Sequence, residues 1–131
     1  MSYTIKKVSQ KLDMTAHTIR HYTDNGLVPN LKHDKNGNRI FDDDSLKWLT
    51  AVRFLRNSGM AIEEIREYFK LCLQGYSTFE ERYKILIRLK EKADADLEQA
   101  KYRAACITDK VEHCKDILAG KVPDDCNPMN W

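Results

Sequence analysis

Apolar residues recur at helical spacing through most of this chain, and short polar stretches separate the segments that carry the pattern. Residues 5–12 place their apolar positions on one side of a helix, which predicts a first short helix built on Ile5, Val8 and Leu12. A second helix is predicted over residues 15–26, because Thr15 is a good N-cap and Gly26 suits the left-handed position that ends a helix. Two short helices joined this closely match a helix-turn-helix unit.

A hairpin is predicted next, because Asn36-Gly37 tolerates the positive φ angles of a tight hairpin turn. The flanking strands are expected at about residues 31–34 and 38–41, with basic residues distributed around the turn: Lys32, Lys35 and Arg39. A basic hairpin directly after a helix-turn-helix is typical of a wing, which grips the sugar-phosphate backbone beside a DNA groove. The alternative is an ordinary solvated surface hairpin.

Two further helices are predicted before the middle of the chain. The third begins at Asp42-Asp43-Asp44-Ser45, which supplies an N-cap and acidic residues, and ends at Ser58-Gly59. Its apolar residues occupy more than one stripe, so we expect it to form the centre of the core through Leu46, Trp48, Leu49, Val52, Phe54 and Leu55. Its arginines, Arg53 and Arg56, either reach phosphate or are solvated. The fourth helix, at about residues 61–74, carries one apolar face of Ile62, Ile65, Phe69 and Leu73.

Residues 77–118 contain no Gly or Pro and predict one long helix. With Phe79 at a d position, a heptad pattern continues over five heptads, long enough to indicate a coiled coil. Every position of this seam except Lys90 is apolar: Phe79, Tyr83, Leu86, Ala93, Leu97, Ala100, Ala104, Ile107, Val111, Cys114 and Leu118. The N-terminal part of the chain is too small to cover an apolar stripe of this length. We therefore expect the chain to form a homodimer in which the two stripes cover each other.

The charges beside the seam favour an antiparallel pair of these helices, centred between Glu98 and Gln99. In that arrangement opposite charges meet across the seam, as Glu80 with Lys115, Asp94 with Lys101 and Asp96 with Arg103. A parallel pair in register sets Lys110 against Lys115. Exposed pairs each contribute only tenths of a kcal/mol, so they select the orientation rather than account for the affinity.

The charge distribution separates the two ends of the chain. Residues 1–41 hold seven Lys or Arg against three Asp or Glu, whereas residues 42–131 hold fifteen against seventeen. The chain is 42% hydrophobic and 32% charged, has no apolar N-terminal core typical of a signal peptide, and has no uncharged apolar run as long as a membrane span. We therefore expect a cytoplasmic protein that has no membrane contact and whose N-terminal head meets a polyanion.

The second predicted helix carries the candidate reading surface. Ile19 and Tyr22 point one way, and the polar and aromatic residues on the other side suit a DNA groove. Taken alone, this helix is better interpreted as an ordinary amphipathic surface helix, and the neighbouring elements are what favour a DNA-binding role. The candidate DNA-binding residues on the helix and the hairpin are Thr15, His17, Thr18, Arg20, His21, Tyr22, Lys32, Lys35, Asn36 and Arg39.

The order of these elements and several of their residues resemble the MerR family of bacterial transcription regulators. The matching segments are YTIKKVSQKLDMTAHTIRHYTDNGLVP, NGNRIF, DDDSLKWL and RFLRNSGMAIEEI, within about residues 3–70. The resemblance implies a mainly α fold: a winged helix-turn-helix head over residues 1–74, an antiparallel dimerisation helix over 75–118, and a short tail over 119–131. It also implies a homodimer on an inverted-repeat promoter, distorted in response to a signal so that RNA polymerase can engage.

Family roles carry over to individual residues of the head. His17 and Thr18 would approach bases, Arg20 and Tyr22 would contact phosphate, and Arg39 would be the wing arginine. The chain departs from the family pattern at three positions. His21 stands where a tyrosine is common, Asn38 replaces a wing tyrosine, and Ala61 lacks the hydroxyl that caps the fourth helix, at a cost of about 1 kcal/mol.

The cysteines support an alternative within the same fold. Cys114 and Cys126 could form a thiol- or metal-responsive site, since thiolates suit soft ions such as Cu(I), although Cys114 also occupies a seam position. Cys72 is expected to be a packed core thiol, and Phe54 stands where carbonyl-sensing relatives carry a cysteine.

Two other classes of protein are weighed against a DNA-binding regulator. No nucleophile–base–acid set is legible, so an enzyme is not predicted, nor is a cofactor. The remaining alternative from another class is a coiled-coil adaptor whose head binds protein.

Overall fold

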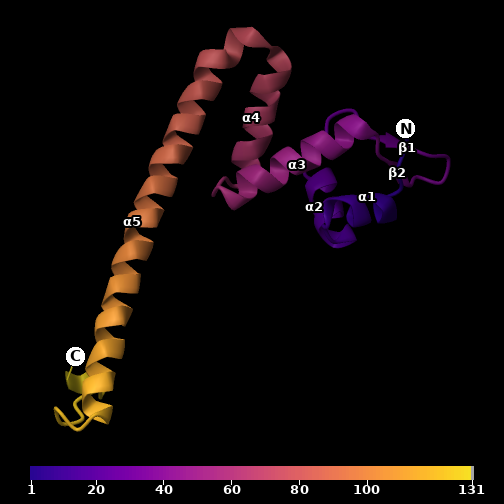
Figure 1. Cartoon of the computed structure of the whole chain (residues 1–131). Coiled ribbons are helices and arrows are strands. Elements are labelled where there is room, and N and C mark those ends of the chain that lie inside the picture. The colour runs from indigo at the N-terminus through magenta and orange to yellow at the C-terminus, as the bar shows by residue number, and fades with distance from the viewer. Residues whose placement is uncertain (131) are drawn as a thin grey trace. The chain divides into compact units, whose positions relative to one another are not determined.

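The computed structural model describes residues 1–130 as a mainly helical chain with one two-stranded antiparallel sheet (Figure 1). It divides into two compact units, the first ending at Lys90 and the second beginning at Glu91. The elements in order are α1 (Ile5–Leu12), α2 (Ala16–Asp24), β1 (Lys32–His33), β2 (Arg39–Ile40), α3 (Asp43–Asn57), α4 (Ile62–Gln74), the 3-10 turn η1 (Tyr76–Thr78), α5 (Phe79–Leu118) and the 3-10 turn η2 (Pro128–Asn130).

The helix-turn-helix is present, with α1 at its predicted bounds and α2 (Ala16–Asp24) shorter than predicted, between the cap residue Thr15 and Gly26. Asp13 adopts a left-handed conformation at the end of α1, with φ of 52°, and turns the chain into α2. At the other end of α2, the amide of Gly26 donates to the Thr23 carbonyl, and the amide of Leu27 donates to the Tyr22 carbonyl. These two bonds with a positive φ at Gly26 form a Schellman motif. The reversal directs the buried Leu27 back into the core.

Two apolar clusters form the core of the first unit, and α3 contributes to both. The first joins α1, α2 and the hairpin to α3 through Val8, Met14, Ile19, Val28, Phe41 and Leu49. The second joins α3 to α4 through Leu27, Val52, Leu55, Met60, Ile65 and Phe69. The start of α5 packs against the second cluster through Ile85 and Leu89. The prediction that the third helix forms the centre of the core is therefore confirmed.

Two apolar residues predicted to be in this core are instead on the surface. Phe54 is 66% exposed and Leu73 is 59% exposed. Phe54 lies on a different side of α3 from Val52 and Leu55, where it lines a shallow surface with Leu46 and Ala51. Helical spacing identified apolar positions on α3, but the tertiary packing covers fewer of them than the pattern offers.

The starts of α3 and α4 differ in how they are capped. Asp42 caps α3 with a capping box, because its Oδ1 accepts from the Ser45 amide at 2.8 Å and the Asp42 amide donates to the Ser45 Oγ at 3.1 Å. Ala61 has no side-chain cap at the start of α4, as predicted, and only Glu64 reaches back to accept from the Ala61 amide at 3.0 Å. Half of the usual reciprocal pair is therefore missing at α4.

The hairpin exists, but its turn differs from the prediction. The strands contain two residues each, paired as Lys32 with Ile40 and His33 with Arg39, so the connecting loop runs from Asp34 to Asn38. Gly37 takes a positive φ of 79°, whereas Asn36 does not. The Asp34 carboxylate organises the loop, because Oδ1 accepts from the amides of Asn36 and Asn38 at 2.9 Å each. An aspartate-centred turn has thus replaced the tight Asn-Gly turn.

The predicted long helix is present as α5, which begins at Phe79 rather than residue 77 because Tyr76–Thr78 form a 3-10 turn after Gly75, where φ is 90°. The structure describes all of α5, and no residue of this helix is buried. Among the seam residues, Tyr83 is 57% exposed, Leu97 is 53% exposed and Ile107 is 64% exposed. Within residues 1–130, no helix combines the length and the apolar character needed to cross a membrane.

Candidate nucleic-acid interface

Helix α2 presents two different faces, as the sequence predicts. Ile19 is fully buried, and Tyr22 packs against both core clusters. His17, Arg20 and His21 are exposed on the other side. The buried face fixes the rotation of the helix about its axis, so the exposed face is a pre-formed row of hydrogen-bond donors and rings.

The first turn of α2 is held by its threonines. The Thr15 Oγ1 accepts from the Thr18 amide at 3.1 Å, and the two hydroxyl groups lie 2.8 Å apart with Thr15 donating. Thr15 therefore acts as the N-cap that the sequence predicts. The Thr18 oxygen accepts in this pair, which leaves the Thr18 O–H group able to donate.

The wing (residues 31–41) brings a second cation to the same region. Arg39 on β2 forms an ion pair with Asp24 at the end of α2. The hydrogen bond from the Asn38 amide, together with that from Asn36, holds the pKa of the Asp34 carboxyl below its ordinary value. Asp34 therefore stays ionised to a lower pH and keeps the loop closed. The closed loop fixes the position of Arg39 at the start of β2.

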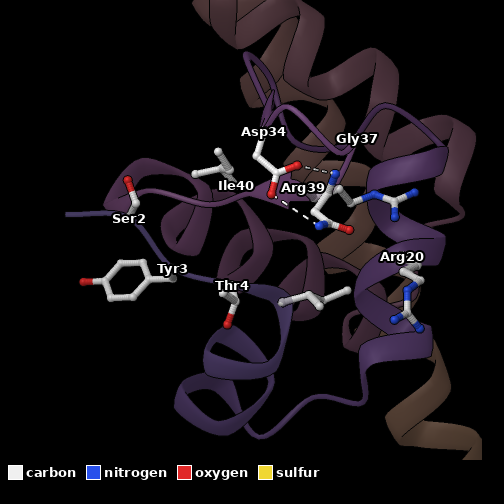
Figure 2. A pocket seen from close by; sticks show the side chains of 10 residues that line it. Ser2, Tyr3, Thr4, Arg20, Asp34, Gly37, Arg39 and Ile40 are labelled. Carbon is white, nitrogen blue, oxygen red and sulfur yellow. Dashed lines mark hydrogen bonds between the residues drawn. The ribbon is translucent and has the colours of Figure 1, made fainter.

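A surface pocket of about 510 Å³ lies between α2, the wing and the N-terminal residues of the chain. Arg20 and Arg39 line it together with Tyr3, Thr4 and Asp34. Figure 2 shows the guanidinium groups of Arg20 and Arg39 on the same side of this pocket. Two planar guanidinium groups from adjacent elements are suited to phosphate oxygens, which they bind in a bidentate manner.

The remaining predicted DNA-binding residues of the wing, and His21 of α2, lie outside this pocket. Lys32, Lys35 and Asn36 are all exposed on the hairpin, and none of them lines the pocket. His21 contacts Asn25, whose side-chain amide donates to the His21 carbonyl at 2.7 Å. The structure therefore brings Arg20 and Arg39 together and leaves the two lysines on the open surface of the wing.

Three arginines bind backbone carbonyls within the first unit; the sequence analysis left Arg53 and Arg56 as phosphate-binding or solvated and made no prediction for Arg66. Arg53 donates to the Leu12 carbonyl, and Arg56 donates to the Met60 carbonyl at 2.8 Å, so neither is simply solvated or directed at phosphate. The Nε of Arg66 on α4 donates to the Asn25 carbonyl at 2.8 Å, at the C-terminal end of α2. Arg53 and Arg66 each bind a carbonyl 41 positions away, for which no local sequence signal exists.

In the second unit, residues of the helix end and of the tail form a thiol cluster. The Sγ atoms of Cys114 and Cys126 lie 3.5 Å apart, and His113 contacts Asp125 through its Nε2. The ligand atoms of His113, Asp125 and Cys126 all lie within 4.8 Å of one another. The hydrogen bond with Cys114 raises the pKa of the Cys126 thiol, and desolvation and the nearby aspartates add to this. The sequence identified the two cysteines but missed His113 and Asp125.

Comparison with proteins of known sequence places the first unit in a family. The model of the MerR HTH family regulatory proteins matches residues 3–72. An HTH-type transcriptional regulator of Haemophilus influenzae is 39% identical over 82 residues, which are 63% of this chain and 61% of that protein. The HTH-type transcriptional regulator AdhR of Bacillus subtilis is 37% identical over 82 residues, which are 63% of this chain and 59% of AdhR. The similarity thus spans about three fifths of the length of these relatives.

Solved structures resemble this chain over most of its length. HiNmlR, described as a MerR family regulator lacking the sensor domain and bound to promoter DNA, superimposes with a TM-score of 0.77 at 29% identity, covering 91% of this chain and 94% of HiNmlR. A MerR family regulator from Bacillus thuringiensis gives a TM-score of 0.73 at 29% identity, covering 86% of this chain and 99% of the other. With its family model covering more than half of the residues, the chain belongs to the MerR family of helix-turn-helix regulators.

Proposed function

We propose that this protein binds double-stranded promoter DNA as a homodimer and regulates transcription from an inverted repeat. The observation that carries the proposal is the pocket where Arg20 of the recognition helix and Arg39 of the wing lie together beside the exposed face of α2. In this arrangement the helix enters a major groove while the wing grips the adjacent backbone. The structurally similar regulator HiNmlR was solved bound to promoter DNA, which supports the proposal that this chain also binds a promoter.

The proposed roles follow from where each side chain lies. His17 and Thr18 stand in the first turn of α2, whose residues approach base edges in a helix-turn-helix. Arg20 and Arg39 bind the phosphate backbone, assisted by Lys32 and Lys35 from the exposed wing. Tyr22 packs its ring against the core, so its contribution to DNA is through the hydroxyl group at the end of that ring.

The proposed homodimer uses α5 as its interface. The seam residues are exposed although most of them are apolar, and a stripe this long is unstable in water unless another helix covers it. In the antiparallel arrangement, the midpoint falls between Glu98 and Gln99. A Gln99→Cys variant should therefore crosslink two chains readily, whereas a single cysteine at Phe79 should not, because the two copies of Phe79 lie at opposite ends of an antiparallel pair. Crosslinking by Phe79→Cys would instead indicate a parallel pair.

The proposed mechanism is distortion of the promoter. Two heads held at a fixed separation contact phosphates at both ends of a site, which supplies the few kcal/mol needed to bend and untwist the DNA between them. A signal changes the distortion, so that RNA polymerase engages the promoter without being bound directly by these residues. The protein is proposed to act in the cytoplasm.

The experiment that tests this function is selection of preferred duplexes from a random pool, followed by a salt titration of the selected site. Affinity for the site should fall steeply with salt, because cationic side chains displace counterions from the DNA. An inverted repeat should emerge from the selection. The absence of any affinity for duplex DNA in dilute buffer would support the adaptor function, in which the head binds protein.

A second candidate function is a metal-responsive variant of the same regulator, favoured by the 3.5 Å approach of Cys114 to Cys126. Two thiolates at this separation suit a soft ion such as Cu(I), and His113 and Asp125 stand beside them. Equilibrium dialysis against Cu(I) under reducing conditions tests this function. Cys114→Ser should lose the binding, while Cys106→Ser, on the same helix, should retain it.

A further inference from the structure

We propose that Cys114 and Cys126 form a redox-modification site, where a hydroperoxide converts the two thiols into an intramolecular disulfide that fastens the tail to α5. The two Sγ atoms lie 3.5 Å apart. A disulfide bond is about 2.05 Å long, so the sulfur atoms need to approach by about 1.5 Å. Rotation of the side chains with a small shift of the tail supplies that movement, since residues 121–127 contain no helix or strand.

The turn at the end of α5 explains why these two residues meet. The amide of Gly120 donates to the Ile117 carbonyl and the amide of Lys121 donates to the Asp116 carbonyl, both at 3.0 Å. Gly120 has a φ of 76°, which a residue with a Cβ adopts only with strain. The chain therefore reverses at Gly120, which is midway in sequence between Cys114 and Cys126.

Further contacts hold the tail in register with the helix. His113 binds Asp125, so the residues just before both cysteines are also joined. The Asp124 carboxylate accepts from the Cys126 amide at 3.1 Å, which orients the cysteine backbone. These contacts reduce the conformational freedom that the thiols lose when they join, which is the main cost of closing such a loop.

The other two thiols are poor partners for this pair. Cys106 lies on α5 eight residues before Cys114, which corresponds to about 12 Å along a helix axis. A disulfide requires Cα atoms within about 7 Å, so these two cysteines cannot be joined while the helix is intact. Cys72 is half-buried on α4 in the first unit, where it contacts Tyr68. The geometry thus selects one pair among the four cysteines.

The reaction balances with a hydroperoxide as the oxidant. Cys114 reacts first, because the pKa of the Cys126 thiol is raised. The Cys114 thiolate attacks the terminal peroxide oxygen, and the O–O bond breaks to give Cys114 sulfenic acid and an alcohol or water. The Cys126 sulfur then attacks the Cys114 sulfur, and the hydroxyl group leaves as water with the Cys126 proton. Two electrons pass from the thiols to the peroxide, and thiol reductants reverse the change.

The test uses the full chain, reduced and kept in EDTA, exposed to hydrogen peroxide and then alkylated. The intact mass before alkylation should fall by about 2 Da, the mass of two hydrogen atoms, and alkylated thiols should fall from the four of the reduced chain to two. Trypsin should yield residues 111–115 joined to residues 122–131, since Lys110, Lys115 and Lys121 are cleavage sites. This readout involves no DNA, so it is independent of the proposed regulatory function.

Matched variants separate this site from general oxidation. Cys126→Ser should leave a Cys114 sulfenic acid that dimedone traps, and a Cys72→Ser/Cys106→Ser double variant should still form the disulfide. Four alkylatable thiols after peroxide treatment, a disulfide between two chains on a non-reducing gel, or a bridge that maps to Cys106 would each overturn the proposal.

Discussion

Replacement of the wing arginine, Arg39→Ala, gives the sharpest test of how this head meets DNA. Arg39 shares a pocket with Arg20, and on the proposed function it exchanges its ion pair with Asp24 for one phosphate. Asp24 is 62% exposed, and an exposed pair contributes at most about 1 kcal/mol to stability. The variant should therefore fold normally, and any loss of binding should report on DNA contact.

The expected magnitude follows from counterion release. Each neutralised phosphate contributes about 0.9 to the slope of log affinity against log salt, so two wings in a dimer contribute about 1.8. Between 50 and 200 mM salt, a fourfold change, the wild-type protein should lose about 12 times more affinity than the variant. The absolute affinity of Arg39→Ala should fall about equally on the selected site and on random duplex.

Fluorescence anisotropy with both duplexes, at several salt concentrations, measures these quantities. Arg88→Ala is the matched control, because Arg88 is an exposed arginine on α5 outside the pocket. It removes the same charge and should leave the slope nearly unchanged. A changed base preference with unchanged overall affinity would refute the assignment of Arg39 to the DNA backbone. Equal losses in Arg39→Ala and Arg88→Ala would show that the effect comes from the net charge of the protein and not from a contact made by Arg39.

Four other perturbations test the fold and the interface. Ile65→Ala, in the second core cluster, should lower the free energy of unfolding by about 2–5 kcal/mol in a denaturant titration. Ala61→Ser should raise that energy by about 1 kcal/mol by supplying the missing cap. Hydrogen bonds from the Asn38 amide to Asp34 and from the Ser45 amide to Asp42 lower the pKa of both carboxyl groups. The stability that these two ionised carboxylates contribute is present above the ordinary aspartate pKa and is lost as pH falls through the lowered values. The melting temperature should therefore fall below about pH 4, and Asp42→Asn should weaken that dependence. Leu97→Glu should shift the dimer towards monomer in sedimentation equilibrium, whereas an unchanged mass would argue against the seam.

The helices of this protein could be predicted because the interactions that begin and end them are local. Thr15 and Asp42 accept from amides three residues later, and Gly26 ends α2 through bonds within five residues. The apolar spacing likewise predicted which face of α2 is buried around Ile19. Such signals lie within one or two helical turns, so the order of residues alone contains them.

The turn of the wing was only partly predictable. Asn36-Gly37 correctly indicated a reversal of the chain, but several loops are compatible with that pair. The Asp34 carboxylate binds two amides at once, and those two bonds lengthen the loop at the expense of the strands. A few hydrogen bonds decide which turn type forms, and the spacing of residues in the sequence does not show which turn type is more stable.

The sequence by itself determined the elements, their caps and the apolar stripe along α5. Tertiary structure alone decided that Arg53 and Arg66 bind distant carbonyls, that Phe54 is exposed, and that His113 and Asp125 lie beside the two cysteines at the end of the chain. The physical reason is range. A cap or a helical face depends on residues within a few positions, whereas a long side chain takes its partner from whatever the packing of other elements brings within reach.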